Sequence, residues 1–395
     1  MSIRHTKYIA RLKSTAPNRL AEGFFACAEN PDIINLGTAE NRVMNDELES
    51  ALRNRQEMTA YDVTYAAAAN DDKLREALAR LYRDYFDIKD AKASQFSMGS
   101  GIAFLVEKLG LVLCEEDDIV LIPKPCYGCF EPDIVLCGAK VEYIDLDKLP
   151  EKPPEKARLL ILTNPGNPIG DVIEEPEKLL EWCYQNPNLH IVSDDVYALS
   201  NRRGNGYKSI AGLPNAKPEV VHQCYGVSKD WGLAGCHAGF FWTRNEELLS
   251  LMKTAQGCFC LSSDTEWLIT RMIGDITFRD NWIQLFRERL IKNESTIYEM
   301  LDAGKIVYRR CDYSLFIMID LRDIAGTPEK ELYVWRELMH KYRVHILPGY
   351  AGFHVDEPGF YRVIFSIPDE ELIEGIRRVV KGVADLRAAA ATNVE

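Results

Sequence analysis

The chain has 395 residues, of which 47% are hydrophobic and 27% charged, and a formal net charge of −13. This length and composition suit a globular protein with one large and one smaller domain. The acidic balance argues against a nucleic-acid partner, because binding phosphates needs clustered Lys and Arg. No apolar stretch reaches the roughly 18 residues expected of a membrane span, and the N-terminus lacks the apolar core of a secretory signal. We therefore expect a cytoplasmic protein whose 11 cysteines are free thiols.

The first half of the chain predicts alternating helices and strands. Residues 1–45 are expected to form an N-terminal arm. Helices are predicted over 71–82 and 102–114, where apolar residues recur at helical spacing. Five short, apolar, β-rich segments are predicted to be strands, with helical patterns such as 176–185 between several of them: 119–123, 140–144, 159–163, 190–194 and 220–225. This alternation predicts a mostly parallel sheet covered on both faces, with ligands at the carboxyl ends of its strands.

The C-terminal part predicts a second α/β unit. A long charged helix is expected from Asp280 to Leu301, where it connects the large domain to a smaller one. Apolar strands follow at 315–320, 344–348 and 361–366. We predict an arm over 1–45 that joins the small domain, a large domain over 46–285 and a small domain over 286–395.

Cys126 and Cys129 form a single C-x-x-C motif. A zinc or redox role would require more than this pair, and no second pair at matching spacing accompanies it. We therefore predict no metal site and read both cysteines as ordinary thiols.

Lys229 follows Ser228 and precedes a Gly-x-x-Gly run. A lysine in this setting is placed to form an imine with a carbonyl cofactor, and pyridoxal 5′-phosphate (PLP) is the cofactor most often held this way. The alternative is a surface lysine that precedes a turn. Three further motifs favour the cofactor.

These motifs supply groups that suit a pyridine ring and an amino acid. Asn167, in a rigid Pro- and Gly-containing turn, could donate its amide to a phenolic oxygen. Asp194 ends a predicted strand and could pair with a pyridinium nitrogen, which keeps the ring able to draw electrons. Tyr197 could bind the same oxygen as Asn167. Arg362, in a C-terminal strand, could clamp a carboxylate with its planar fork. Alone, each has an ordinary reading as a turn, a helix cap or a surface ion pair.

Together the motifs resemble the fold-type I PLP-dependent enzymes, the class I/II aminotransferase superfamily, from about Ile33 to Arg378. Four segments resemble 1-aminocyclopropane-1-carboxylate (ACC) synthases and their fungal relatives: 34–41, 261–266, 314–322 and 357–365. The resemblance implies an α/β fold, in which a large domain holds a mostly parallel seven-stranded sheet flanked by helices, plus a smaller α/β domain. It also implies a homodimer that acts on a small-molecule amino acid.

The resemblance implies roles around the cofactor ring. Lys229 would be the Schiff-base lysine and later the base that moves the Cα proton. Asp194 would pair with the pyridine nitrogen. Asn167 and Tyr197 would bind the phenolic oxygen, and Tyr127 would stack on the ring face.

The resemblance also implies roles at the phosphate and at the substrate. Gly101 and Ile102 would offer backbone N–H groups to the phosphate at a helix N-terminus. Ser228 would add its hydroxyl, and Tyr65 would reach the phosphate of the neighbouring subunit. The substrate would meet two further residues, Arg362 at its α-carboxylate and Glu40 near its amino end.

Several positions depart from the family pattern. The family places a phosphate-binding arginine eight residues after the lysine, where this chain has His237. Ala103 and Gly226 occupy positions where hydroxyl side chains are common, so we expect PLP to bind more loosely than usual. Pro132 lies near the position of an ACC synthase arginine, which puts S-adenosylmethionine in doubt as the substrate. Asn70, where glycine is usual, indicates an altered substrate pocket.

Three hypotheses follow from these residues. The first is an ACC synthase-like lyase that eliminates a group, such as sulfur, from Cβ or Cγ of an α-amino acid. Its expected setting is secondary metabolism. The second is an aminotransferase, which shares every motif and differs in where the proton returns. The third is a protein of the same fold that binds without catalysis, in which the weakened phosphate site marks lost function.

Overall fold

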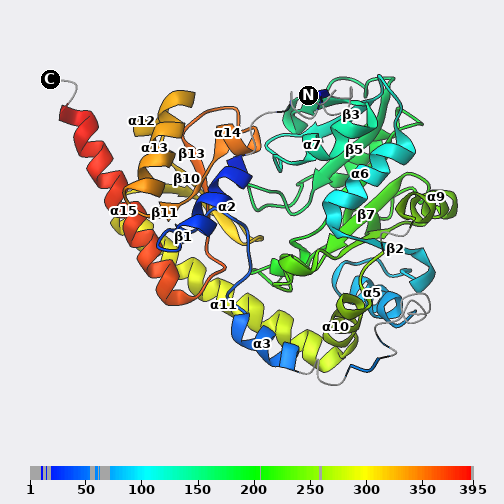
Figure 1. Cartoon of the computed structure of the whole chain (residues 1–395). Coiled ribbons are helices and arrows are strands. Elements are labelled where there is room, and N and C mark those ends of the chain that lie inside the picture. Colours follow the sequence, from blue (N-terminus) through cyan, green and yellow to red (C-terminus); the bar gives the residue numbers. More distant parts are fainter. Residues whose placement is uncertain are drawn as a thin grey trace, which may run out of the picture.

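The computed structural model describes residues 10–11, 15, 19–53, 58–60, 62, 72–204, 206–257 and 260–392. Within these ranges it contains a seven-stranded sheet, a four-stranded sheet and a two-stranded pair, with helices packed around them (Figure 1). Tyr65 and Asn70 lie outside the described residues. Among the helices of the described ranges, none has the length and apolar character needed to cross a membrane.

The seven-stranded sheet confirms the predicted parallel core. Its strand order is β2-β8-β7-β6-β5-β3-β4, and only β8 runs antiparallel to its neighbours. The strands are β2 (Phe96–Gly99), β3 (Ile119–Pro123), β4 (Lys140–Ile144), β5 (Ala157–Thr163), β6 (His190–Asp194), β7 (Val221–Gly226) and β8 (Gly239–Trp242). The five strands predicted from the sequence correspond to β3 to β7.

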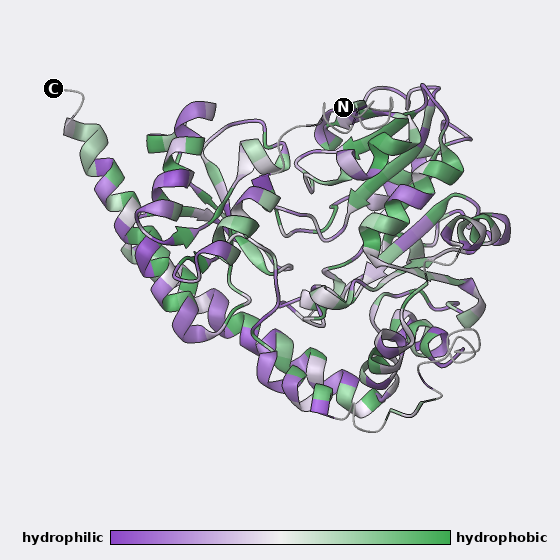
Figure 2. Ribbon diagram, viewed as in Figure 1, coloured by the Kyte–Doolittle hydropathy of each residue, from purple (hydrophilic) through white to green (hydrophobic). Residues whose placement is uncertain are grey.

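Both faces of this sheet are apolar, as a parallel sheet between two helical layers requires. Along β5, Leu159 and Ile161 point into one buried cluster, while Leu160 and Leu162 point into the other. Successive side chains of a strand face opposite sides, so one apolar run supplies both layers. The hydropathy colouring accordingly shows hydrophobic strands between more hydrophilic outer helices (Figure 2).

The helices of this part include the three predicted from the sequence and two that begin at side-chain caps. The predicted helices 71–82, 102–114 and 176–185 correspond to α5 (Asp72–Tyr85), α6 (Gly101–Leu113) and α8 (Pro176–Cys183). Two further helices, α9 (Glu246–Gln256) and α10 (Ser263–Gly274), follow Asn245 and Ser262, whose side chains accept backbone N–H groups of the first turn. The remaining helices here are α2 (Arg19–Glu29), α3 (Asn45–Arg53) and α7 (Phe130–Ile134).

A single helix, α11 (Ile276–Ala303), runs from beside α3 and α10 to the smaller sheet (Figure 1). Its 28 residues extend the predicted helix 280–301 at both ends. At the N-terminal end Asp275 caps the helix by accepting the Phe278 N–H at 3.0 Å. The predicted domain boundaries at 45/46 and 285/286 stay predictions, and α11 crosses 285/286 without a break.

The four-stranded sheet is antiparallel, in the order β12-β13-β10-β9. Its strands are β9 (Val307–Arg309), β10 (Phe316–Asp320), β12 (Leu347–Pro348) and β13 (Phe360–Ile364), with α12 (Arg322–Ala325), α13 (Pro328–His340), α14 (Gly349–Phe353) and α15 (Asp369–Thr392) around them. The predicted strand 344–348 is in fact two short strands, since β11 (Val344–His345) pairs in parallel with β1 (Ile34–Asn35). This pairing places the end of the arm beside the C-terminal sheet.

The loop after β3 contacts α14 and the segment that follows α14. The N–H of Cys126 donates to the Phe353 carbonyl at 2.9 Å, and Lys124 forms an ion pair with Asp356. A Cβ on Gly128 would lie 2.3 Å from the Gly352 carbonyl oxygen. Only a glycine hydrogen therefore fits at position 128 with this backbone arrangement.

Candidate active site

A cavity of about 500 Å³ lies at the carboxyl ends of β5, β6 and β7. Ten of the predicted site residues line it: Gly101, Ile102, Tyr127, Asn167, Asp194, Tyr197, Ser228, Lys229, His237 and Arg362. Glu40 does not line it, but its neighbour Ala39 does. The structure therefore brings together residues that are spread over more than 260 positions of the sequence, at the edge of the sheet where ligands were expected.

Lys229 follows β7 and is half-buried in the cavity wall. Its Nζ donates a hydrogen bond of 2.6 Å to the Ala39 carbonyl. Burial and the nearby charge of Arg362 lower the pKa of Lys229 to about 8, against the opposing effect of Glu40 and Asp194. A neutral amine is therefore accessible at moderate pH, which a nucleophile or base requires.

The adjacent acids Asp194 and Asp195 face different surroundings. Asp194 lines the cavity, and burial together with the charge of Asp195 raises its pKa to about 7. Asp195 instead accepts hydrogen bonds from Ser193 Oγ and, at 3.2 Å, from Gln223 Nε2. Only Asp194 of this pair is therefore presented to a ligand in the cavity.

Arg362, on β13, is 1% exposed and has capacity left for a ligand. Its Nη1 donates to Asn167 Oδ1 at 2.8 Å and its Nη2 donates to the Gly37 carbonyl. The rings of Phe316 and Phe353 lie 4.7 and 4.6 Å from the guanidinium carbon. Its Nε has no hydrogen-bond partner among the described residues. Burial lowers the pKa of Arg362 only to about 10, so the group stays charged at neutral pH.

Two phenols complete the walls of the cavity. Tyr197 is 2% exposed and meets Phe316 edge-on, with ring centroids 5.3 Å apart. Tyr127 meets Phe130 in the same way at 5.4 Å. Burial raises the pKa of both phenols above the ordinary value, so each remains a neutral hydrogen-bond donor.

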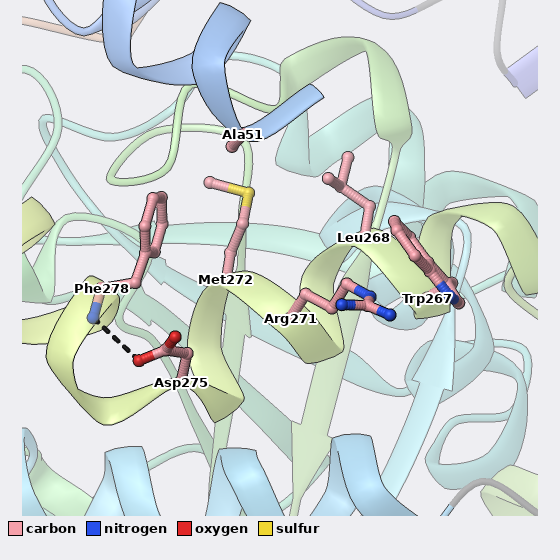
Figure 3. A pocket seen from close by; sticks show the side chains of 7 residues that line it. All are labelled: Ala51, Trp267, Leu268, Arg271, Met272, Asp275 and Phe278. Atoms are coloured by element: carbon pink, nitrogen blue, oxygen red, sulfur yellow. Dashed lines mark hydrogen bonds between the residues drawn. The ribbon is translucent and has the colours of Figure 1, made fainter. Parts of the chain in front are cut away.

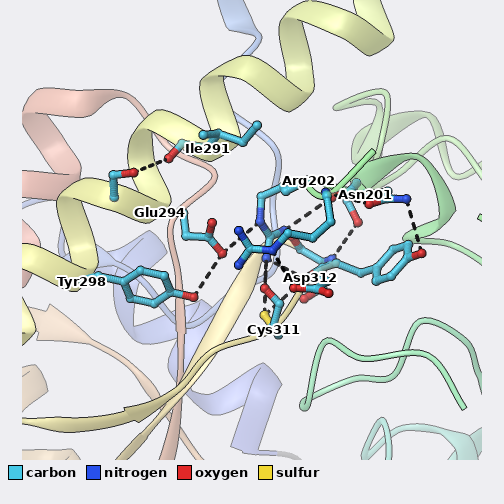
Figure 4. A network of polar contacts seen from close by, with 12 residues as sticks. Asn201, Arg202, Ile291, Glu294, Tyr298, Cys311 and Asp312 are labelled. Carbon is cyan, nitrogen blue, oxygen red and sulfur yellow. Dashed lines mark hydrogen bonds and ion pairs between the residues drawn. The ribbon is translucent and has the colours of Figure 1, made fainter. Parts of the chain in front are cut away.

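Sequence reasoning missed the network that fixes Tyr197. Ser200, at the end of the turn that Tyr197 begins, donates to the Tyr197 carbonyl and accepts the Ser314 N–H at 2.6 Å. Arg202 holds the same two segments together. Its guanidinium donates to Glu294 at 3.1 Å and to the backbone carbonyls of Cys311, Tyr313 and Ser314 (Figure 4). The sequence shows only an Arg-Arg pair in a loop, which carries no signal of this role.

Asp230, next to Lys229, was also missed. Its Oδ2 accepts the Leu199 N–H at 2.9 Å and the Tyr225 hydroxyl at 3.1 Å, and its backbone carbonyl accepts the Trp282 indole N–H at 3.1 Å. Asp230 thus ties the turn that carries Lys229 to the turn that follows Tyr197.

The end of the cavity beside α6 carries the departures from the family pattern. His237 lines it in a left-handed conformation, with φ of 45°. A Cβ on Gly239 would lie 2.5 Å from the Gly101 carbonyl carbon, so β8 and the start of α6 touch closely. A Cβ on Gly226 would lie 2.9 Å from the Ala238 oxygen. A serine at position 226 would therefore require the backbone around Ala238 to shift.

The residues present fit PLP. A carboxyl, a lysine and two phenols face one cavity, and α6 begins at its edge with Gly101 at φ of 87°. The Thr163 hydroxyl, which also lines the cavity, has no partner among the described residues. A ligand with an aromatic nitrogen, a phenolic oxygen and a phosphate would satisfy these groups.

A second cavity is separate from this site. It has a volume of about 300 Å³, lies between α3, α10 and α11 and is lined by none of the predicted site residues (Figure 3). The C-x-x-C motif is divided, since Cys126 is in the core and Cys129 lines the active-site cavity. In the described part of the chain, no group of three His, Cys, Asp or Glu side chains could hold a metal ion.

Comparisons with known proteins agree with this geometry. Residues 31–379 match the family model for aminotransferase class I and II. The chain is 26% identical to 1-aminocyclopropane-1-carboxylate synthase 8 of Arabidopsis thaliana, over 91% of this chain and 86% of that protein. It is 30% identical to the human 1-aminocyclopropane-1-carboxylate synthase-like protein 1, over 90% and 77%.

Solved structures share the fold. A putative kynurenine aminotransferase from Saccharomyces cerevisiae matches with a TM-score of 0.80 at 20% identity, over 97% of this chain and all of that one. An aspartate aminotransferase from Thermus thermophilus matches with a TM-score of 0.79 at 18% identity, over 96% of this chain and all of that one. The chain therefore belongs to the class I and II aminotransferase family and is a PLP-dependent enzyme of fold-type I.

Proposed function

We propose that this enzyme eliminates a leaving group from Cβ or Cγ of an α-amino acid. The observation that carries the proposal is the convergence of Lys229, Asp194 and Arg362 on one cavity. Proton removal at Cα and binding of an amino acid carboxylate both require this set. The ACC synthase and ACC synthase-like names of the relatives support elimination as the outcome.

Each residue has a proposed task. Arg362 binds the substrate α-carboxylate, with Asn167 beside it, and exchanges its bond to the Gly37 carbonyl for the ligand. Lys229 removes the Cα proton. Bound PLP supplies the electron sink that makes this proton acidic. Asp194 keeps the ring nitrogen protonated, and Tyr197 donates a hydrogen bond to the phenolic oxygen.

The phosphate, the amino end and the ring face complete the assignment. Gly101, Ile102, Ser228 and His237 hold the phosphate, and Tyr127 stacks on the ring. Glu40 acts near the amino end, in keeping with its electrostatic effect on Lys229. We also propose a homodimer in which Tyr65 reaches the partner's phosphate, as the family resemblance implies.

The walls of the cavity favour an apolar side chain with a sulfur leaving group. From α2, Leu20, Phe24 and Phe25 line the cavity. Pro132, near the position of an ACC synthase arginine, lines a neighbouring cavity instead. These observations support an S-substituted cysteine or homocysteine as the substrate class rather than S-adenosylmethionine.

The test is product analysis with two amino acids that differ in their leaving group. The holoenzyme is incubated with β-chloroalanine and with S-ethylcysteine, and pyruvate, ammonia and ethanethiol are measured. We expect pyruvate and ammonia from both amino acids and ethanethiol from S-ethylcysteine alone, and no product with Lys229→Ala. Conversion that needs an added 2-oxo acid and leaves pyridoxamine phosphate would instead support an aminotransferase. A wild type that turns over neither amino acid, with or without a 2-oxo acid, would overturn elimination at Cβ and transamination of these amino acids.

A further inference from the structure

One acidic side chain in the cavity wall has no task in the reaction described above. Asp133, on α7, lines the same cavity as Lys229 and Arg362. Its Oδ2 is buried and finds no hydrogen-bond partner in the part of the chain that the structure describes. A negative charge on this half-buried carboxylate is costly, because no donor replaces the water that Oδ2 loses. The surroundings thus favour a carboxyl group that keeps its proton.

The neighbours of Asp133 reinforce this preference. The Asp133 N–H donates to the Cys129 carbonyl at 3.1 Å, and the carboxyl lies close enough to Tyr127 to raise the pKa of that phenol. Across from it, Glu107 on α6 is paired with Lys108 at 2.9 Å. Burial, and secondarily the negative charge of Glu107, raise the pKa of Asp133 to about 7. Near neutral pH, Asp133 therefore both holds a proton and can give it up.

The position of Asp133 suits contact with the substrate side chain. Cys129 and Asp133 are four residues apart and both line the cavity, so they share one wall. Tyr127, on the same wall, is proposed to face the ring. The α-carboxylate is proposed to bind at Arg362, on a strand of the other sheet. This leaves the wall of α7 free to meet the part of the substrate beyond Cα.

We propose that Asp133 is the general acid that protonates the departing group, and this inference rests on the proposed elimination. The carbon–sulfur bond breaks and its electron pair leaves with sulfur. The proton of the Asp133 carboxyl bonds to that sulfur and gives a neutral thiol. The Asp133 carboxylate then regains a proton from water, so the residue is unchanged after each turnover.

A general acid matters only for a leaving group that is a strong base. A thiolate has a conjugate acid with a pKa of about 8.5 in cysteine, whereas chloride needs no proton to leave. Positioned acids contribute roughly 10²–10⁴-fold to such steps. Removal of the Asp133 proton should therefore slow loss of a thiol and spare loss of chloride.

The experiment compares Asp133→Asn with the wild-type holoenzyme on S-ethylcysteine and β-chloroalanine. We expect kcat/KM for S-ethylcysteine to fall by about 10²-fold or more, and kcat/KM for β-chloroalanine to stay within about threefold of wild type. The wild-type pH profile for S-ethylcysteine should show a loss of rate at high pH, and this limb should be absent in the variant. Asp133→Glu, which keeps an acid, should recover part of the lost rate.

Glu131→Gln is the matched control, since Glu131 lies on the same helix but accepts from Tyr143 at 3.0 Å and lines the neighbouring cavity. It should leave both reactions unchanged. Cofactor absorbance and melting temperature show whether each variant is folded and loaded. Equal losses on both amino acids in a folded, loaded Asp133→Asn, or no loss on either, would overturn the role of Asp133. A wild type that fails on β-chloroalanine would instead refute the proposed elimination itself.

Discussion

Two buried arginines of this enzyme, Arg202 and Arg362, differ in how fully the protein binds their N–H donors. Arg202 bonds to Glu294 and to the carbonyls of several residues around it (Figure 4). Arg362 has no acidic partner among its described contacts, keeps an unpaired Nε and lies between two aromatic rings. Both side chains are almost fully enclosed.

The difference shows that burial of a charge does not by itself mark a functional site. A guanidinium has five N–H donors, and a structural arginine uses them on protein acceptors. An arginine with unused N–H donors raises the free energy of the free enzyme, because buried donors lack partners. A carboxylate ligand would supply these partners and so bind more tightly. Unused capacity is therefore the better signal of binding, and it separates Arg362 from Arg202.

The largest expected effect is on folding, from Arg202→Met. This change leaves Glu294 buried without its cation, and removal of one partner from a buried pair costs about 3–5 kcal/mol. Denaturant unfolding should show this loss in the free energy of unfolding. Arg202→Met combined with Glu294→Leu should recover much of it, and an unchanged loss in the double variant would contradict the explanation.

Arg362→Met should impair activity rather than folding. We expect the free energy of unfolding to change little, because no buried acid loses its partner. We expect kcat/KM for the amino acid to fall by roughly 10²–10³-fold, since truncation of one partner of a buried charge pair costs about 2–5 kcal/mol. Arg362→Lys keeps the charge but loses the fork, so it should remain impaired. Steady-state kinetics and a melting curve on the same samples decide the comparison.

Asp194 extends the comparison to an acid. Its pKa is raised from 3.8 to about 7 by burial and by Asp195, so the folded apoprotein holds a proton that the unfolded chain releases. The stability that this proton confers is complete below pH 3.8 and is lost as pH rises through about 7. Asp194→Asn should reduce this fall in unfolding free energy, by at most about 4 kcal/mol for a shift of about three pKa units. Identical pH profiles for the two apoproteins would show that the pKa of Asp194 does not rise on folding, which contradicts the prediction.

The smallest effect concerns a third arginine, introduced as His237→Arg. The new side chain would offer a charged fork to the phosphate, in place of a single neutral donor. We expect PLP to bind about fivefold more tightly, which corresponds to roughly 1 kcal/mol. Titration of the apoenzyme with PLP measures this change, and His237→Ala, which should weaken binding, is its control.

The sequence predicted the parts of the fold that depend on local pattern. Buried parallel strands are continuous apolar runs, so β3 to β7 were recognisable. In contrast, β2 and β8 have four residues each and show no distinct periodicity. The division of 344–348 depends on pairing with the distant β1, which no local pattern encodes.

The candidate site, like the fold, could be predicted from the sequence only in part. Lys229, Asp194, Asn167 and Arg362 stand in motifs that the family resemblance makes visible, and the structure gathers them in one cavity. Contacts between distant positions were not accessible, as with Arg202 and Glu294, which are 92 residues apart. The role proposed for Asp133 rests on the absence of a partner for Oδ2 among the described residues, and only coordinates show this.

The contact at Gly128 limits which residue can occupy this position. Because a Cβ there would lie 2.3 Å from the Gly352 oxygen, the loop after β3 and α14 approach each other to within the size of one hydrogen atom. An alanine at position 128 would force this loop or α14 to move. Gly128 directly follows Tyr127, which lines the cavity, so the close packing of a residue outside the cavity helps to hold one of its walls in place.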